Sequence, residues 1–187
     1  MAKKSLSNVN WLQSTAVRVT RVHFLYIAAY MASIVIFDSW NLYTHPEIGN
    51  RWTAAAILLV VNTIIWYTAR IRFNSDTVYI LLVLALVVAD IIFAGTNVFW
   101  ERGIASKAVA LFAIPIITAA ALRSRSALLA TTTLCAAAYS TAVIRYFNLH
   151  YGESFRVELY GYVFFYCAVF FVFSWLLLVI IRPGNDL

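Results

Sequence analysis

Six apolar stretches, each about as long as a membrane-crossing helix, follow one another along the chain and limit what it can fold into. They cover residues 22–42, 52–69, 78–98, 104–122, 127–147 and 159–181. A hydrocarbon core of about 30 Å needs about 20 apolar residues for each helical crossing. Only 12% of the 187 residues are charged, against about 25% in soluble domains. We therefore expect an all-α, polytopic membrane protein, folded as a bundle of six transmembrane helices.

The segments between these stretches are too short to fold as a separate soluble domain. We expect a juxtamembrane segment over 1–21, a transmembrane domain over 22–181 and a tail over 182–187. In the first part Leu12, Ala16 and Val19 recur at helical spacing, which fits either an amphipathic helix on the membrane surface or a plain lead-in. No nucleophile–base set, metal-ligand spacing or phosphate-binding loop occurs. We expect no enzyme activity, no cofactor and no metal site.

The basic residues favour one orientation in the membrane. Alternate loops place nine Lys and Arg on one side and five on the other. The nine are Lys3, Lys4, Arg18, Arg21, Arg70, Arg72, Arg123, Arg125 and Arg182. Because cytoplasmic loops carry the excess of positive charge, both termini are expected in the cytoplasm of a bacterial inner membrane. The net charge of +6 then reflects this bias and not a nucleic-acid surface. The expected partners are lipids, a second copy or a signalling protein.

One acid lies deep inside a predicted crossing. Asp90 is about 12 residues, or about 18 Å, into the third stretch, near the middle of the membrane. A buried carboxylate there is costly unless it is protonated, hydrogen-bonded or in contact with water. Asn97 follows on the same helical face, and further polar candidates at comparable or outer depth are Asn62, Asp38, Tyr139, Tyr166 and Arg145. They outline a cavity that opens outward, above an apolar inner half with a basic rim. Alternatively, Asp90 only ties helices together.

Pro115 falls in the middle of the fourth stretch. A proline removes one backbone hydrogen bond and bends a helix. It is the candidate hinge, although membrane helices also contain prolines that serve packing alone.

Residues 90–127 resemble the membrane sensor region of multi-pass bacterial histidine kinases. Those regions carry an Asp and a Thr in the third helix, a G-G-x-x-S-P loop, a Leu-Phe or Leu-Tyr pair, a Leu-Pro-Ile run and a short basic turn. The matching positions here are Asp90, Thr96, Gly103, Ser106, Leu111, Phe112, Pro115, Ile116, Arg123 and Arg125. Arg102 and Lys107 replace a glycine and the proline of the loop. Those replacements weaken the quinone binding that the resemblance implies for redox-sensing members.

The resemblance and the Asp90 stripe together predict a sensory or regulatory membrane domain without the kinase domains. Its candidate ligand site includes Asp90, Asn97 and the loop residues Arg102, Gly103 and Ser106. A small transporter or channel, proton-coupled through Asp90, is the first alternative. A structural subunit of a membrane complex is the second.

Overall fold

The computed structural model describes residues 2–40, 42–101, 103, 106–150 and 157–181. Within these residues every regular element is a helix. The order along the chain is α1 (Ala2–Ser39), α2 (His45–Arg70), α3 (Asp76–Trp100), the 3-10 helix η2 (Lys107–Phe112), α4 (Ala113–Ala120), α5 (Arg125–Leu149) and α6 (Val157–Ile180). The all-α prediction is confirmed in that part of the chain. The predicted tail over 182–187 and Arg102 lie outside the described residues.

Five of the helices are long and apolar enough to cross a membrane: Trp11–Ser39 within α1, then α2, α3, α5 and Tyr160–Ile180 within α6. The predicted fourth crossing is shorter, because its helical part covers only Lys107–Ala120. Its first six residues form the 3-10 helix, which rises about 2 Å per residue. With the eight α-helical residues that follow, the segment reaches about 24 Å. The 3-10 geometry therefore recovers part of the length that the segment lacks in residues.

Pro115 explains where this segment changes geometry. It is the third residue of α4, not the middle of a long α-helix as expected. In the first turn of a helix an N–H has no intrahelical acceptor, so proline costs little there. Further along, its ring would clash with the carbonyl four residues earlier, which here belongs to Leu111. The chain before Pro115 is accordingly 3-10 and not α.

The first helix is much longer than the predicted crossing. Residues 2–39 contain neither Gly nor Pro, and α1 runs through them without a break for 38 residues, or about 57 Å. The predicted juxtamembrane segment is thus continuous with the first crossing. A hydrocarbon core of about 30 Å covers only part of such a helix.

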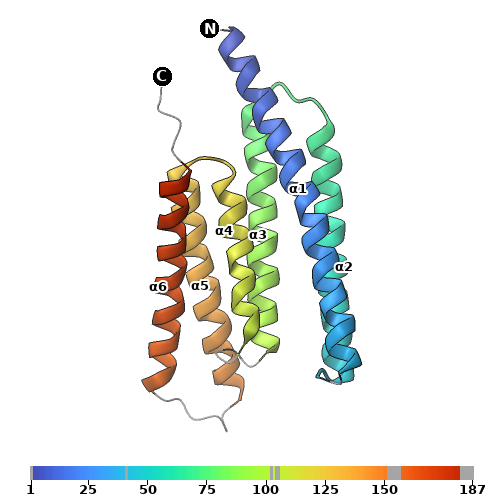
Figure 1. Cartoon of the computed structure of the whole chain (residues 1–187), viewed down its shortest axis with the longest axis vertical. Coiled ribbons are helices and arrows are strands. Elements are labelled where there is room, and N and C mark those ends of the chain that lie inside the picture. Colours follow the sequence, from blue (N-terminus) through green and yellow to red (C-terminus); the bar gives the residue numbers. More distant parts are fainter. Residues whose placement is uncertain (1, 41, 102, 104–105, 151–156, 182–187) are drawn as a thin grey trace. The chain divides into compact units, whose positions relative to one another are not determined.

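The chain divides into two compact units, Met1–Ala89 and Asp90–Leu187. In the first unit α1 packs against α2 (Figure 1). The buried positions of α2 recur at alternating spacings of four and three residues, the pattern of a helix with one continuous packing seam. They are Arg51, Ala55, Leu58, Asn62, Ile65 and Ala69.

In the second unit α4 packs against α5 and α6, and α5 packs against α6 (Figure 1). Small and hydroxyl side chains lie along the α5–α6 contact. The hydroxyl groups of Thr132 and Ser174 are hydrogen-bonded to each other, and the Ser140 hydroxyl lies 3.6 Å from the Cys167 thiol. Such polar contacts join helices in a membrane, where apolar surfaces gain little from meeting each other.

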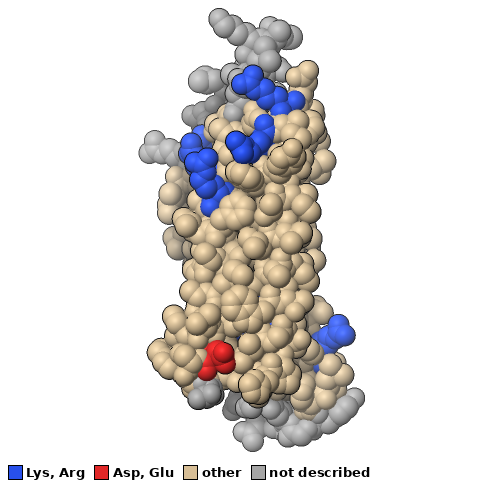
Figure 2. Space-filling model, turned by 90° about the vertical axis from the view of Figure 1, so that its right-hand side faces the viewer, with Lys and Arg blue, Asp and Glu red and all other residues tan. Residues whose placement is uncertain are grey.

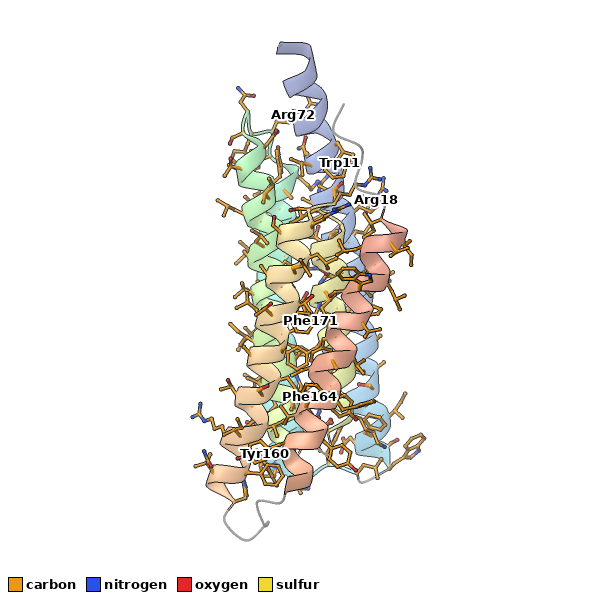
Figure 3. The ribbon with its side chains drawn as sticks, turned by 90° about the vertical axis from the view of Figure 1, so that its left-hand side faces the viewer. Trp11, Arg18, Arg72, Tyr160, Phe164 and Phe171 are labelled. Carbon is orange, nitrogen blue, oxygen red and sulfur yellow. The ribbon has the colours of Figure 1, made fainter. Side chains whose placement is uncertain are left out.

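The sixth helix presents large apolar side chains to its surroundings. Phe164, Trp175 and Ile180 are each at least two-thirds exposed, and Figure 3 shows Phe164 and Phe171 along α6. A helix that is apolar on every side suits lipid and not water.

At Gly95 the backbones of α3 and α5 approach each other closely. A Cβ added to Gly95 would lie 4.0 Å from the backbone oxygen of Ala138, which is ordinary van der Waals contact. We expect Gly95→Ala to fold normally, whereas Gly95→Leu forces the two backbones apart. Overpacking of this kind costs about 1–3 kcal/mol. In detergent, the melting temperature of Gly95→Leu should fall by several degrees while that of Gly95→Ala does not. Equal behaviour of the two variants would contradict the close approach.

Candidate functional site

Asp90, the predicted centre of the site, is buried in α3 with 1% of its surface exposed. It lies within electrostatic reach of the Cys135 thiol on α5. Asn97 lies two turns further along the same face of α3 and is also fully buried. Its amide donates to the carbonyl of Phe93 at 2.8 Å. Two predicted site residues of α3 are therefore buried.

Tyr139 and Tyr166, two of the predicted site residues, contact each other in a cluster of aromatic rings. Their ring centroids are 5.6 Å apart, and Tyr139 also meets Phe112 of η2 at 6.1 Å and Phe170 of α6 at 5.9 Å. Phe112 and Phe170 contact each other at 5.4 Å. Edge-to-face contacts at these distances are favourable. The cluster links η2, α5 and α6, and Tyr139, its member from α5, has no exposed surface.

The hydroxyl of Tyr139 has no hydrogen-bond partner among the residues that the structure describes. A buried hydroxyl without a partner costs about 1–3 kcal/mol. Such groups are uncommon and usually indicate a water, an ion or a ligand. This hydroxyl is the clearest place in the second unit where a further molecule could bind.

The described residues of the loop after α3 cap the helix that follows. The Ser106 hydroxyl donates to the Glu101 carboxylate at 3.0 Å and accepts from the backbone N–H of Ala108, and that N–H also donates to Glu101 at 3.1 Å. Acceptors at a helix start satisfy its free N–H groups. Gly103 has φ +62, a conformation that favours glycine. Ser106 and Gly103, predicted as ligand residues, thus have structural roles. Nothing is described for Arg102, the third loop candidate.

Three other predicted site residues lie elsewhere. Asn62 and Asp38 belong to the unit Met1–Ala89, whereas Asp90 belongs to the other. The Asn62 amide donates to the Thr20 carbonyl at 3.1 Å and joins α2 to α1. Asp38 is exposed near the end of α1. Arg145 is exposed as well, with its guanidinium 5.9 Å from the centre of the Phe99 ring.

The prediction of an apolar inner half is wrong. Thr132 and Ser174 are fully buried in the halves of α5 and α6 that adjoin the basic turn 123–125 and the end of α6, and Thr131 is nearly so. In the first unit His23 is buried in α1, with its Nδ1 3.0 Å from the Val19 carbonyl. Thr132 and His23 bond to carbonyls of their own helices, so they can be buried without a partner on another helix. A histidine inside an apolar run was the one available signal.

A basic pocket in the first unit was also missed. It has a volume of about 490 Å³, and it is lined by Gln13, Ser14, Val17, Arg18, Arg21, Arg70 and Arg72. All four arginines had been counted only as orientation charges. On the face drawn in Figure 2, basic side chains gather near one end of the helices. Their sequence signal is the i, i+3 pair of arginines on α1 together with the pair that ends α2.

No family model, no curated protein and no solved structure matches the chain. The resemblance to histidine-kinase sensor regions therefore stays a prediction.

The capping role of Ser106 can be tested directly. Loss of a helix cap costs about 0.5–2 kcal/mol. We expect Ser106→Ala to lower the melting temperature by a few degrees, because the Ala108 N–H loses an acceptor. Ser106→Thr is the matched control, because it keeps the hydroxyl acceptor, and it should melt close to the wild type. Ser106→Asp is unsuitable, because it would place a second carboxylate beside Glu101. A Ser106→Ala variant as stable as the wild type would show that the cap contributes little.

Proposed function

We propose that the chain is a membrane-embedded sensory or regulatory domain that binds a small amphipathic molecule inside its second unit. The observation that supports this best is the buried Tyr139 hydroxyl, which lacks a partner among the described residues. The proposed ligand is an uncharged molecule with an oxygen that accepts a hydrogen bond from this hydroxyl. An apolar body suits the surrounding rings of Phe112, Tyr166 and Phe170.

The position of Tyr139 supports signalling as well as binding. Its ring contacts Phe112, the last residue of the 3-10 helix, directly before α4 begins. Stretches of 3-10 helix inside a longer helical segment often mark hinges. A ligand that binds one geometry of η2 better than the other shifts the population toward it. The moving element of the proposal is therefore η2, and Pro115 sets where its geometry must change.

The wider setting of the proposal follows from charge and length. We infer six crossings, with the segment Lys107–Ala120 as the fourth, and both termini in the cytoplasm of a bacterial inner membrane. The supports are the nine basic residues against five and the five helices of spanning length. The activity is proposed to be non-enzymatic, and the signal would pass to a membrane or cytoplasmic partner.

Hydrogen exchange at η2 tests the sensing proposal. The probes are menadione and 2-nonanone, which are small, apolar molecules with carbonyl acceptors, added to protein in nanodiscs. We expect at least one probe to slow exchange in Lys107–Phe112 about tenfold. Tyr139→Phe should abolish that response while the unliganded variant melts at or above the wild-type temperature, because an unsatisfied hydroxyl is gone.

Tyr166→Phe is the matched control, since it removes a hydroxyl from the neighbouring ring and should keep the response. Two results contradict the proposal: no change in exchange with either probe, or a Tyr139→Phe variant that responds like the wild type.

Proton-coupled transport through Asp90 is the second candidate. Transport is favoured by buried polar groups on the inner half of the second unit, where the sequence led us to expect only apolar ones. These groups are Thr131, Thr132 and Ser174. Transport needs polar groups at more than one depth, and Asp90 and Asn97 supply the others. In liposomes with an internal pH-sensitive dye, this candidate predicts proton flux that Asp90→Asn abolishes and Thr131→Val slows. An intact flux in Asp90→Asn, or none in the wild type, excludes it.

A further inference from the structure

The basic pocket of the first unit combines concentrated charge with a fixed backbone. Four exposed arginines line it, two from α1 and two from the end of α2 and the turn that follows. None of the four makes an ion pair with an acid among the described residues. The nearest acid in sequence, Asp76, opens α3 and does not line the pocket. Within the part of the chain that the structure describes, the pocket therefore keeps an uncompensated positive charge.

Buried contacts hold the backbone that carries two of these arginines. The Tyr79 hydroxyl donates to the Ile71 carbonyl at 3.0 Å and accepts from the Phe73 N–H at 2.9 Å. These two residues flank Arg72, so its backbone is held on both sides. Tyr79 itself is completely buried. The Arg70 guanidinium lies 4.7 Å from the centre of the Trp66 ring, a cation–π contact that orients it.

Gln13 reduces the negative potential of the free carbonyl groups at the end of α2, which would repel an anion in the pocket. The C-terminus of a helix carries partial negative charge on its free carbonyls. The Gln13 amide lies 3.3–3.5 Å from the carbonyls of Ala69, Arg70 and Ile71, at the end of α2. Those oxygens are thereby covered by a donor. The charged lining groups are the four guanidinium groups, whose planar fork matches phosphate oxygens.

The position of the pocket along α1 corresponds to the headgroup layer of a bilayer. Arg18 and Arg21 are 21 and 18 residues before Ser39, the last residue of α1, which places them about 27–32 Å along the helix from that end. That distance is close to the thickness of the hydrocarbon core, about 30 Å. Figure 3 shows Arg18 and Arg72 toward the same end of the first unit. With the far end of α1 at one interface, the arginines lie at the other.

We propose that this pocket is a binding site for a phosphate-bearing anion, with Arg18, Arg21, Arg70 and Arg72 as the groups that contact the phosphate. A volume of about 490 Å³ is in the range of small-molecule sites. The phosphate belongs either to an anionic phospholipid headgroup or to a soluble phosphate. The proposal requires that α1 crosses the membrane, but it is independent of Tyr139 and of sensing.

Arg18→Gln/Arg72→Gln is the informative variant, because neither side chain makes a hydrogen bond, ion pair or ring contact with another described residue, and folding should be kept. Seven basic residues would still face five, so the orientation is expected to be unchanged. Arg123→Gln/Arg125→Gln is the matched control: it removes the same charge from a basic turn of the second unit, where the two arginines line a cavity of only about 10 Å³. That space is about enough for one water molecule.

The measurement is the shift in melting temperature of the full chain in detergent. Three additions are compared at equal ionic strength: short-chain phosphatidylglycerol, short-chain phosphatidylcholine and inorganic phosphate. For a ligand at ten times its dissociation constant we expect a rise of about 3–6 °C. The Arg18→Gln/Arg72→Gln variant should need at least about tenfold more ligand for the same rise.

The outcomes separate the two sources. A shift with phosphatidylglycerol and not phosphatidylcholine, weakened in the pocket variant alone, supports a lipid headgroup. A shift with inorganic phosphate, weakened in the same variant, supports a soluble ligand. The proposal is overturned if neither anion shifts the melting temperature, or if the control variant loses the shift to the same degree.

Discussion

The structure depends first on the need to satisfy every backbone N–H and C=O without water. In a bilayer that need leaves helices as the solution for a chain of this composition. The same constraint governs the side chains: hydroxyls of Thr20, Thr132 and Ser140 donate to carbonyls three or four residues earlier in their own helices. Polar residues of this kind are hidden from lipid at little cost. They make a helix look more polar in sequence than its surface is.

The fourth helical segment shows the constraint at its limit. Pro115 cannot donate a backbone hydrogen bond, and the preceding six residues take 3-10 geometry. The loop before them would expose free N–H groups, and there Ser106 and Glu101 act as acceptors. Ser106, which matches the family's loop, therefore also meets the requirements of starting a short helix. The positions that match a family pattern and the positions that bind a ligand need not coincide.

Much of the fold was predictable because hydropathy reports directly on lipid exposure. The apolar runs located α3, α5 and α6 to within two residues, whereas α2 begins seven residues before the predicted start at 52. The first helix begins earlier still, because nothing in 2–21 interrupts a helix. The site was less predictable. The depth of Asp90 along its helix follows from the sequence. The contact of Tyr139 with Tyr166 and the place of Asn62 in the α1–α2 contact require knowing which helices pack together. The four arginines were overlooked because a charge that sets orientation and a charge that binds an anion look the same in sequence.

The two proposed sites differ in what binding can accomplish. Around Arg72 the backbone is held on both sides by a buried tyrosine. The backbone of the pocket therefore keeps the same geometry before and after an anion binds. Such a site stabilises the protein and fixes its depth, but it gives no differential affinity between two conformations and hence no switch. Tyr139 instead contacts the last residue of a 3-10 helix, a geometry that has an α-helical alternative close in energy. If the protein responds to a ligand by changing shape, the aromatic cluster is the place where binding energy can be converted into movement. The arginine pocket would instead bind its anion without a change of shape.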